Sequence, residues 1–199
     1  MKLEDYKLIF VTVGLIGLLL FASPTLGLVL KMPASEAFSE LYILGPEHML
    51  EDIPFNVRAN VSYLVYLGVG NQMGSSAYYT CYVKLRNTSE PLPNATLGTP
   101  SPLPALYEFK PFIKDGQTWE TPLTFKVNSL SLSSNESLLQ SITINDKEFA
   151  VNKTATWNAE SSGYYYDLFI ELWAYNAAMG AVQYNNRFVQ LYVNVTGNI

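Results

Sequence analysis

Six asparagines of this 199-residue chain stand in the tripeptide Asn-X-Ser/Thr, with X other than proline, which is the acceptor sequence for N-linked glycans. They are Asn60, Asn87, Asn94, Asn135, Asn152 and Asn194. The chain contains 15 Asn and 29 Ser or Thr, so chance alone would give roughly 2 such tripeptides. Asn and Ser also favour turns, which raises that chance count somewhat. The excess predicts glycans at several of these positions, on a surface outside the cytoplasm.

Residues suited to metal binding or nucleophilic catalysis are few. His48 is the one histidine of the sequence, so a histidine-rich metal site or a Ser-His-Asp constellation would depend on a single candidate. Glu47, Glu51 and Asp52 surround it, but without the ligand spacing of a calcium loop. We expect His48 to be exposed in a solvated acidic loop, with no metal and no cofactor.

Paired carboxylates are the remaining catalytic possibility. Asp167 and Glu171 share one face of a predicted strand, four residues apart, which separates them by about 13 Å. Glycosidases hold their two carboxylates closer together than this. The sequence also contains no Gly-rich phosphate loop and no GxSxG motif. It therefore predicts a protein that is not an enzyme, with no catalytic residue.

The element that must place the six asparagines outside is the uncharged stretch from Leu8 to Leu30, between Lys7 and Lys31. As a helix its 23 residues would extend roughly 34 Å, enough to cross the hydrocarbon core of a bilayer. We expect a short cytoplasmic tail (1–7), one transmembrane helix (8–30), a linker (31–38) and an extracellular domain (39–199).

Two other interpretations of this stretch stay open, a cleaved secretory signal with Ala22 to Pro24 near the cut and a buried helix of a soluble protein. The apolar run continues past Pro24 to Leu30, which a signal peptide does not need. Lys2 and Lys7 on one side against Lys31 on the other favour the tail inside and the carboxy-terminal domain outside. The expected location is the cell membrane, with a single pass.

The chain after the stretch alternates apolar and polar residues in short runs, which is typical of strands with one buried face. Val61 to Val69 and Ala77 to Leu85 are the clearest runs, and we expect them to form a hairpin. Five prolines between Glu90 and Pro104 predict an exposed, partly polyproline loop. The spacing of the runs predicts an all-β fold, an antiparallel immunoglobulin-like β-sandwich.

The single cysteine, Cys81, lies in register with apolar neighbours, so we expect a buried core residue, with an intermolecular bridge as the alternative. After Lys31 there are 15 acidic and 9 basic residues, and this negative surface argues against nucleic acid as a partner. Tyr78, Tyr82, Tyr165 and Trp173 are expected on outward sheet faces. There they would serve cross-strand packing or stack on a sugar or a partner protein.

Four blocks resemble an archaeal family of membrane proteins known only as a domain of unknown function. They read SELYILGPE (39–47), KDGQTWETPLTF (114–125), YYYDLFIELWAYN (164–176) and NNRFVQLYVNVT (185–196). The resemblance implies a membrane segment joined to an extracytoplasmic β-rich domain at an archaeal cell surface. Longer members carry several membrane helices where this chain offers one, and the family supplies no catalytic residues.

These observations predict a membrane-anchored, N-glycosylated cell-surface protein that acts as a structural or adhesive module of the cell envelope. Its expected partners are the lipid bilayer, covalent N-glycans and an envelope or membrane protein. One alternative is a sugar-binding module or an accessory subunit of a membrane complex. Another is a filament subunit that exchanges strands, which would require the anchor to be cleaved.

Overall fold

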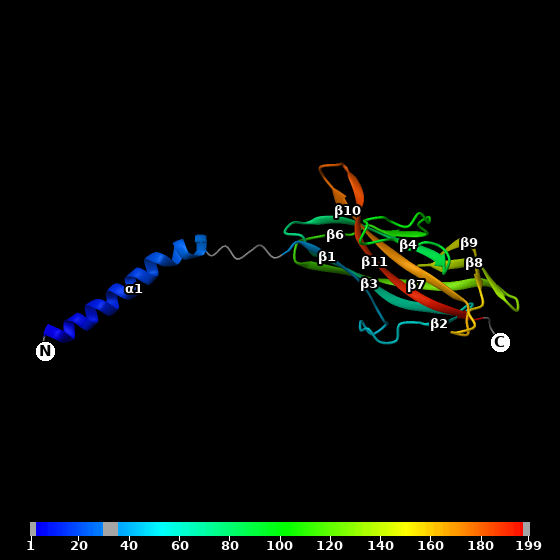
Figure 1. Ribbon diagram of the computed structural model, residues 1–199, viewed down its shortest axis with the longest axis horizontal. Helices are drawn as coiled ribbons and strands as arrows, with labels where there is room; N and C mark the ends of the chain where they lie inside the picture. The colour runs from blue at the N-terminus through cyan, green and yellow to red at the C-terminus, as the bar shows by residue number, and fades with distance from the viewer. Residues whose placement is uncertain (1–2, 30–35, 197–199) are drawn as a thin grey trace. The chain divides into compact units, whose positions relative to one another are not determined.

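A computed structural model describes residues 3–29 and 36–196, and Figure 1 shows them as one helix and a set of strands. The chain divides into two compact units, with the boundary between Ala37 and Phe38. The side chains described on the helix are those of residues 6–21. Most of the linker predicted for residues 31–38 lies outside the described residues.

The first unit contains helix α1, Leu3–Val29, which starts within the predicted tail and is continuous over 27 residues. Leucine is the most frequent residue in its sequence, and the described side chains are exposed, with Phe10 at 83% and Phe21 at 89%. In the part of the chain that the structure describes, no helix is both long enough and apolar enough to cross a membrane.

The second unit contains eleven strands in the described residues. Their bounds are β1 Phe38–Leu44, β2 Asn56–Arg58, β3 Ser62–Gln72, β4 Ala77–Asn87, β5 Tyr107–Phe109, β6 Phe112–Ile113, β7 Gln117–Leu132, β8 Glu136–Ile144, β9 Lys147–Thr156, β10 Tyr165–Asn176 and β11 Ala181–Thr196. The predicted all-β character of this part of the chain is confirmed.

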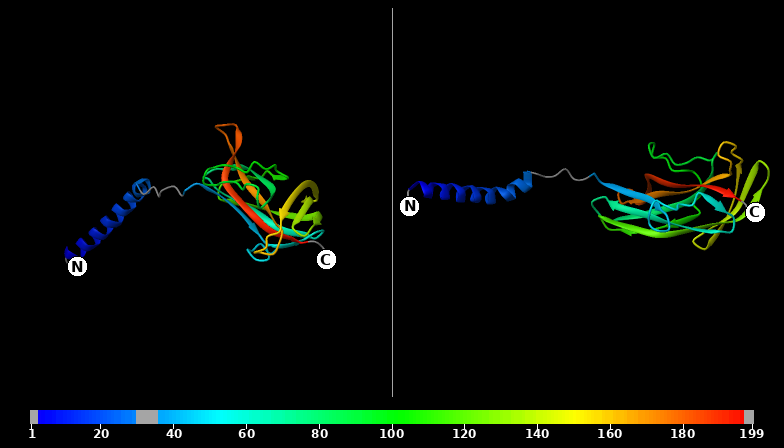
Figure 2. Two further views of the ribbon diagram at one scale, coloured as in Figure 1. Left: turned by 45° about the vertical axis from the view of Figure 1, so that its right-hand side comes forward. Right: turned by 90° about the horizontal axis from the view of Figure 1, so that it is seen from below.

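The strands form two sheets that enclose one hydrophobic core. Sheet A has the order β1-β3-β7-β8-β9, and sheet B has the order β2-β11-β10-β4-β5, with β6 also paired to β4. Figure 2 shows β3 and β7 on one side of the unit and β10 and β11 on the other. Buried valines, leucines and isoleucines from both sheets fill the space between them. All pairs are antiparallel except β2 with β11, which is a parallel pair of three residues.

The immunoglobulin-like pattern is matched by one sheet and not by the other. The strand order β11-β10-β4 in sheet B corresponds to the order of the G, F and C strands in an immunoglobulin domain. In sheet A, β7, β8 and β9 instead run outward one after another, whereas an immunoglobulin domain places its edge strand D earlier in the chain than E. The strand order therefore establishes a two-sheet β unit, a broader class than the one predicted.

The predicted hairpin between Val61–Val69 and Ala77–Leu85 is wrong, although both strands exist. β3 pairs with β1 and β7, whereas β4 pairs with β10, β5 and β6, so the two strands lie in opposite sheets. The side chain of Asn71 donates to the carbonyls of Ser75 and Ile113 at 2.8 and 2.9 Å, which holds the segment that crosses between the sheets. Apolar–polar alternation shows that a strand has a buried face, but it does not show which strand it pairs with. β3 and β4 each bury one face against the same core from opposite sheets.

A tight turn and a strand proline show how local sequence fits the sheets. β8 and β9 form a hairpin through Asn145 and Asp146, whose positive φ angles of 44° and 64° fit a type I′ turn. Pro122 of β7 pairs with Tyr66 of β3, while β8 joins β7 only from Phe125 onward. The missing amide hydrogen of Pro122 thus faces a side of β7 that carries no strand in the described residues, as a proline in a sheet requires.

Cys81 lies in the core and is fully buried. Burial raises the pKa of its thiol to about 12. The thiol is therefore protonated at neutral pH, and its position in β4 keeps it away from other chains. The prediction of a core residue is confirmed over the alternative of an intermolecular bridge.

We predict that Leu172→Ala lowers the free energy of unfolding by about 2–5 kcal/mol, because it opens a cavity in a packed core. Leu172 is 0% exposed on the central strand β10. Leu97→Ala is the matched control, since Leu97 is 76% exposed and its truncation should change stability by less than about 0.5 kcal/mol. Denaturant unfolding of the two variants measures the difference, and equal losses would contradict the placement of the core.

Candidate functional site

Four of the six predicted glycosylation asparagines are exposed: Asn60, Asn94, Asn135 and Asn152. Asn60 and Asn152 have positive φ angles of 64° and 48°, a conformation that asparagine tolerates better than other residues. The side chain of Asn94 accepts a hydrogen bond from the Leu97 amide through Oδ1, which leaves Nδ2 free among the described residues. Nδ2 is the atom that carries an N-linked glycan, so these four sites are sterically open.

The other two asparagines are half-buried, and their side chains hold loops in place. Nδ2 of Asn87 donates to the carbonyl of Thr154 at 2.8 Å, and its Oδ1 accepts from Ser89 and Glu90. Nδ2 of Asn194 donates to Asn56 at 3.1 Å, and its Oδ1 accepts from the amide of Tyr164. Of the six predicted acceptor asparagines, four therefore have accessible side chains and two have side chains that are hydrogen-bonded within the fold.

Sheet B carries a strip of two buried ion pairs that the sequence did not indicate. Arg86 of β4 donates through Nε to Asp167 of β10 at 2.7 Å, and the Asp167 side chain is 2% exposed. Further along the same strands, Lys84 lies 3.0 Å from Glu171, whose side chain is 0% exposed. The two carboxylates suspected of catalysis are thus each neutralised by a cation from the neighbouring strand.

The loop between Glu90 and Pro104 is largely exposed, as predicted, and its buried part covers this strip. The amide of Ser101 donates to Glu171 Oε1 at 2.7 Å, and its carbonyl accepts from Lys84 Nζ at 2.8 Å. The Glu90 and Thr88 carbonyls accept from the guanidinium of Arg86. A proline has a backbone carbonyl but no N–H, so a proline-rich segment offers more hydrogen-bond acceptors than donors. Such a segment is suited to accept hydrogen bonds from buried cations. We call residues 88–106 the covering segment.

Burial and charge shift two titrations beside this strip. Burial raises the pKa of Tyr184 to about 12, with a further contribution from the Glu171 carboxylate. Burial also raises the pKa of Asp167, while Arg86 acts in the opposite direction. Oδ1 of Asp167 and Oη of Tyr184 are buried without a hydrogen-bond partner among the described residues. At neutral pH the Tyr184 phenol therefore stays protonated and the Asp167 carboxylate stays bound to Arg86, so we assign both groups a structural role.

His48 is half exposed, but it is not simply solvated as predicted. Its Nδ1 pairs with Glu120 of β7, and its ring stacks on Tyr66 of β3 with centroids 3.8 Å apart. Tyr42 donates a longer hydrogen bond of 3.4 Å to the same carboxylate. Glu120 is distant in sequence from His48, which is why local sequence could not indicate the pair. The group fastens the loop after β1 to the outer face of sheet A.

The outward aromatics predicted on sheet B are mostly packed on other side chains. Tyr165 is 3% exposed and stacks on Tyr192, with ring centroids 4.9 Å apart. Trp173 meets the edge of Tyr82 at 5.6 Å and donates through Nε1 to Glu171 at 3.0 Å. Tyr78 keeps an exposed ring, at 37%. These rings support the cross-strand packing interpretation.

A metal centre has no support in the residues that the structure describes, because no group of three or more His, Cys, Asp or Glu side chains converges there. This holds for the acidic loop of Glu47, Glu51 and Asp52 as well. The described residues thus provide four exposed asparagines in Asn-X-Ser/Thr tripeptides, paired buried charges and packed rings.

Residues 32–133 match the family described as Domain of unknown function (DUF1616). The matched range is slightly more than half of the 199-residue chain. The chain belongs to this family. Within the DUF1616 chain the match runs from the residues before β1 to the end of β7, so the resemblance of the blocks at 164–176 and 185–196 lies outside it. No curated protein matches the sequence at a significant level.

Among solved structures, the DUF1616 chain is similar to a β-glucosidase from Listeria innocua at 12% identity and a TM-score of 0.41. The same enzyme in complex with gluconolactone gives 11% identity and a TM-score of 0.39. The matches cover 82% and 83% of this chain, but 16% and 17% of the enzyme chains. The chain thus spans about a sixth of their length.

We predict that Lys84→Met lowers the free energy of unfolding by about 3–5 kcal/mol, because it leaves the Glu171 carboxylate buried without its cation. Adding Glu171→Gln should restore a large part of that loss, since the amide carries no charge. Lys110→Met is the control, because Lys110 and Glu108 form a pair with both side chains about half exposed, and it should leave stability unchanged. Urea unfolding of the four proteins tests this, and a Lys84→Met loss that Glu171→Gln does not reduce would contradict the coupling.

Proposed function

We propose that this protein is a membrane-anchored, N-glycosylated module of the cell surface with its β unit outside the cell. The observation that carries the proposal is the organisation of the chain. A continuous helix holds an uncharged run of apolar residues, and a separate compact β unit follows it. The position of the six Asn-X-Ser/Thr tripeptides, all in the β unit, supports the same orientation.

The anchor is proposed from the sequence of the run Leu8 to Leu30, which extends beyond residue 21, the last helix position whose side chain the structure describes. A helix of this length spans roughly 34 Å, which matches the hydrocarbon thickness of a bilayer. The described apolar side chains between residues 8 and 21 are exposed on all sides of the helix, and in water such a surface is unfavourable. A lipid environment removes that cost, and Lys7 and Lys31 would lie at its two boundaries.

A structural or adhesive role is proposed for the β unit. Its two suspected carboxylates are neutralised by buried cations, and its aromatic rings largely pack on each other. Four open asparagines stand on several different loops and strands, so glycans would surround the unit. Immunoglobulin-like architecture, which sheet B supports through its strand order, is a common scaffold for surface recognition modules.

The anchor is tested by placing charge in the middle of α1. We predict that the double variant Leu15→Arg with Leu18→Arg moves the protein out of the carbonate-washed membrane fraction, since each arginine costs about 2.5–3.5 kcal/mol at the centre of a membrane helix. Leu97→Arg with Leu132→Arg is the control, because both leucines are exposed in the β unit. Mass spectrometry must also find the amino terminus intact, and a mature chain that begins after residue 24 would contradict a retained anchor.

Glycosylation is tested by site occupancy in the native host. We predict modification at Asn60, Asn94, Asn135 and Asn152, with lower occupancy at the two asparagines whose Nδ2 is hydrogen-bonded in the fold. Thr96→Ala should remove one glycan mass from the intact protein, whereas Thr118→Ala, which changes no acceptor tripeptide, should remove none. Glycopeptide mass spectrometry measures both, and six unmodified asparagines would refute this part of the proposal.

A further inference from the structure

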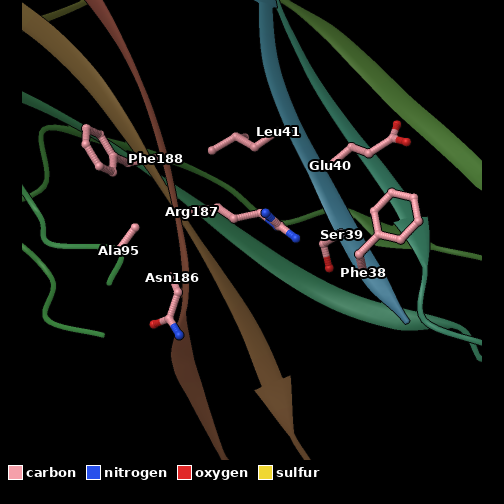
Figure 3. Close-up of a pocket in the computed structure, with 8 residues that line it drawn as sticks. All are labelled: Phe38, Ser39, Glu40, Leu41, Ala95, Asn186, Arg187 and Phe188. Carbon is pink, nitrogen blue, oxygen red and sulfur yellow. The ribbon is translucent and has the colours of Figure 1, made fainter. Parts of the chain in front are cut away.

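A pocket of about 420 Å³ with polar and apolar walls lies in the β unit between β1 and β11. This volume falls within the range of small-ligand sites, roughly 300–1,000 Å³. Figure 3 shows the residues that line it, which are Phe38, Ser39, Glu40, Leu41, Ala95, Asn186, Arg187 and Phe188. Ala95 belongs to the covering segment, but none of the paired charges or acceptor asparagines described above lines the pocket.

Arg187 is the charged group of this pocket. Its side chain extends from β11 toward β1 and ends near Ser39 (Figure 3). It makes no hydrogen bond or ion pair with any of the residues that the structure describes, unlike Arg86 on β4 of the same sheet. A guanidinium offers five donors in a planar fork that suits a carboxylate. Arg187 thus presents an unused anion-binding group to the pocket.

The one carboxylate in the lining does not neutralise Arg187. Glu40 leaves β1 on the opposite side from Ser39, and Figure 3 shows its carboxylate directed away from the guanidinium. It lies over Gly70 of β3, where an added Cβ would come within 2.4 Å of Glu40 Oε2. Because Gly70 has no side chain, the Glu40 side chain can lie over it on the outer face of sheet A. The pocket keeps a net positive charge.

Ser39 lines the pocket with only 2% of its surface exposed, and the network behind it leaves its Oγ as a hydrogen-bond acceptor. Asn71 uses both Nδ2 hydrogens on the carbonyls of Ser75 and Ile113, so its Oδ1 must accept, and Tyr79 Oη donates to it at 3.0 Å. Tyr79 has one hydroxyl hydrogen, so the 2.8 Å bond between Ser39 and Tyr79 must be donated by Ser39. Only lone pairs of Ser39 Oγ remain for a ligand.

The walls of the pocket fit a compact ring with polar edges. Phe38 is 41% exposed at the start of β1, and Phe188 is half-buried on β11. Apolar ring faces of this kind pack against the C–H faces of a sugar. Asn186 adds an exposed amide, and its side chain is held near Gly98, where an added Cβ would lie 3.2 Å from Oδ1. Donors, an acceptor and ring faces thus surround one space.

We propose that this pocket binds an acidic sugar, a uronic acid residue of a saccharide, through its carboxylate on Arg187 and a hydroxyl on Ser39. A neutral sugar would leave the guanidinium unpaired, and a simple carboxylate would leave the Ser39 acceptor unused. An amino acid fits less well, because its ammonium would find no anionic partner and would lie close to Arg187. This proposed binding site does not depend on the anchor or on the glycans proposed above.

The test is equilibrium binding by the full-length protein in detergent micelles, with glucuronate, glucose and acetate as probes. Glucuronate should bind at least about tenfold more tightly than either of the others, because each lacks one of the two required groups. Arg187→Gln should weaken glucuronate binding by about tenfold or more, and Ser39→Ala by about two- to tenfold. Arg58→Gln is the matched control, since Arg58 lies on β2 outside the pocket, and it should bind as the wild type does.

Three results would overturn the proposal. They are no binding of glucuronate at tens of millimolar concentration, binding that Arg187→Gln leaves unchanged, and acetate binding as tight as that of glucuronate. Thermal unfolding of each variant confirms that it is folded before its affinity is interpreted. Sedimentation separates two sources of the sugar: self-association that glucuronate disperses assigns it to the glycans of a second copy, and binding of a soluble uronate polymer by a monomer assigns it to a polysaccharide.

Discussion

The constraint on which the β unit depends is that β10 is buried on both faces. One face meets the core, and the other carries Asp167 and Glu171 beneath the covering segment. A carboxylate that leaves water must find a cation and donors, and here Arg86, Lys84 and the Ser101 amide supply them. These contacts join β4, β10 and the covering segment. They place an irregular, proline-rich segment on a defined part of sheet B.

Once sheet B is fixed in this way, the rest of the surface takes a consistent arrangement. β11 pairs with β10 from Ala181 to Asn194, with an irregularity at Asn185 and Asn186, and its other side is joined only at its end by the three residues of β2. This leaves Asn186, Arg187 and Phe188 open toward β1, which is the edge strand of sheet A. The pocket therefore lies where the edges of the two sheets approach each other. The same architecture turns four asparagines outward and occupies two others with loop contacts.

Much of the fold was predictable from alternation. The predicted runs at 61–69 and 77–85 correspond to strands β3 and β4, and the blocks at 164–176 and 185–196 correspond to β10 and β11. Partner choice was not predictable, because a strand that buries one face against the core can belong to either sheet, as β3 and β4 show. The acceptor asparagines could be named from the sequence. Arg187 and Ser39 could not be linked, because they are far apart in the chain and match no motif.

The sequence by itself determined the two-part organisation of this protein, since an uncharged apolar run and alternating polar strands are local properties of the chain. It also predicted a buried Cys81, which the structure confirmed, and it located the six Asn-X-Ser/Thr tripeptides. Only the tertiary structure decided which acceptors are open, which charges are paired and which remain free. The physical reason is that burial and pairing depend on residues brought together from distant strands. Arg86 and Arg187 are both arginines on strands of the same sheet, and only their neighbours in space distinguish a buried structural cation from an unpaired one.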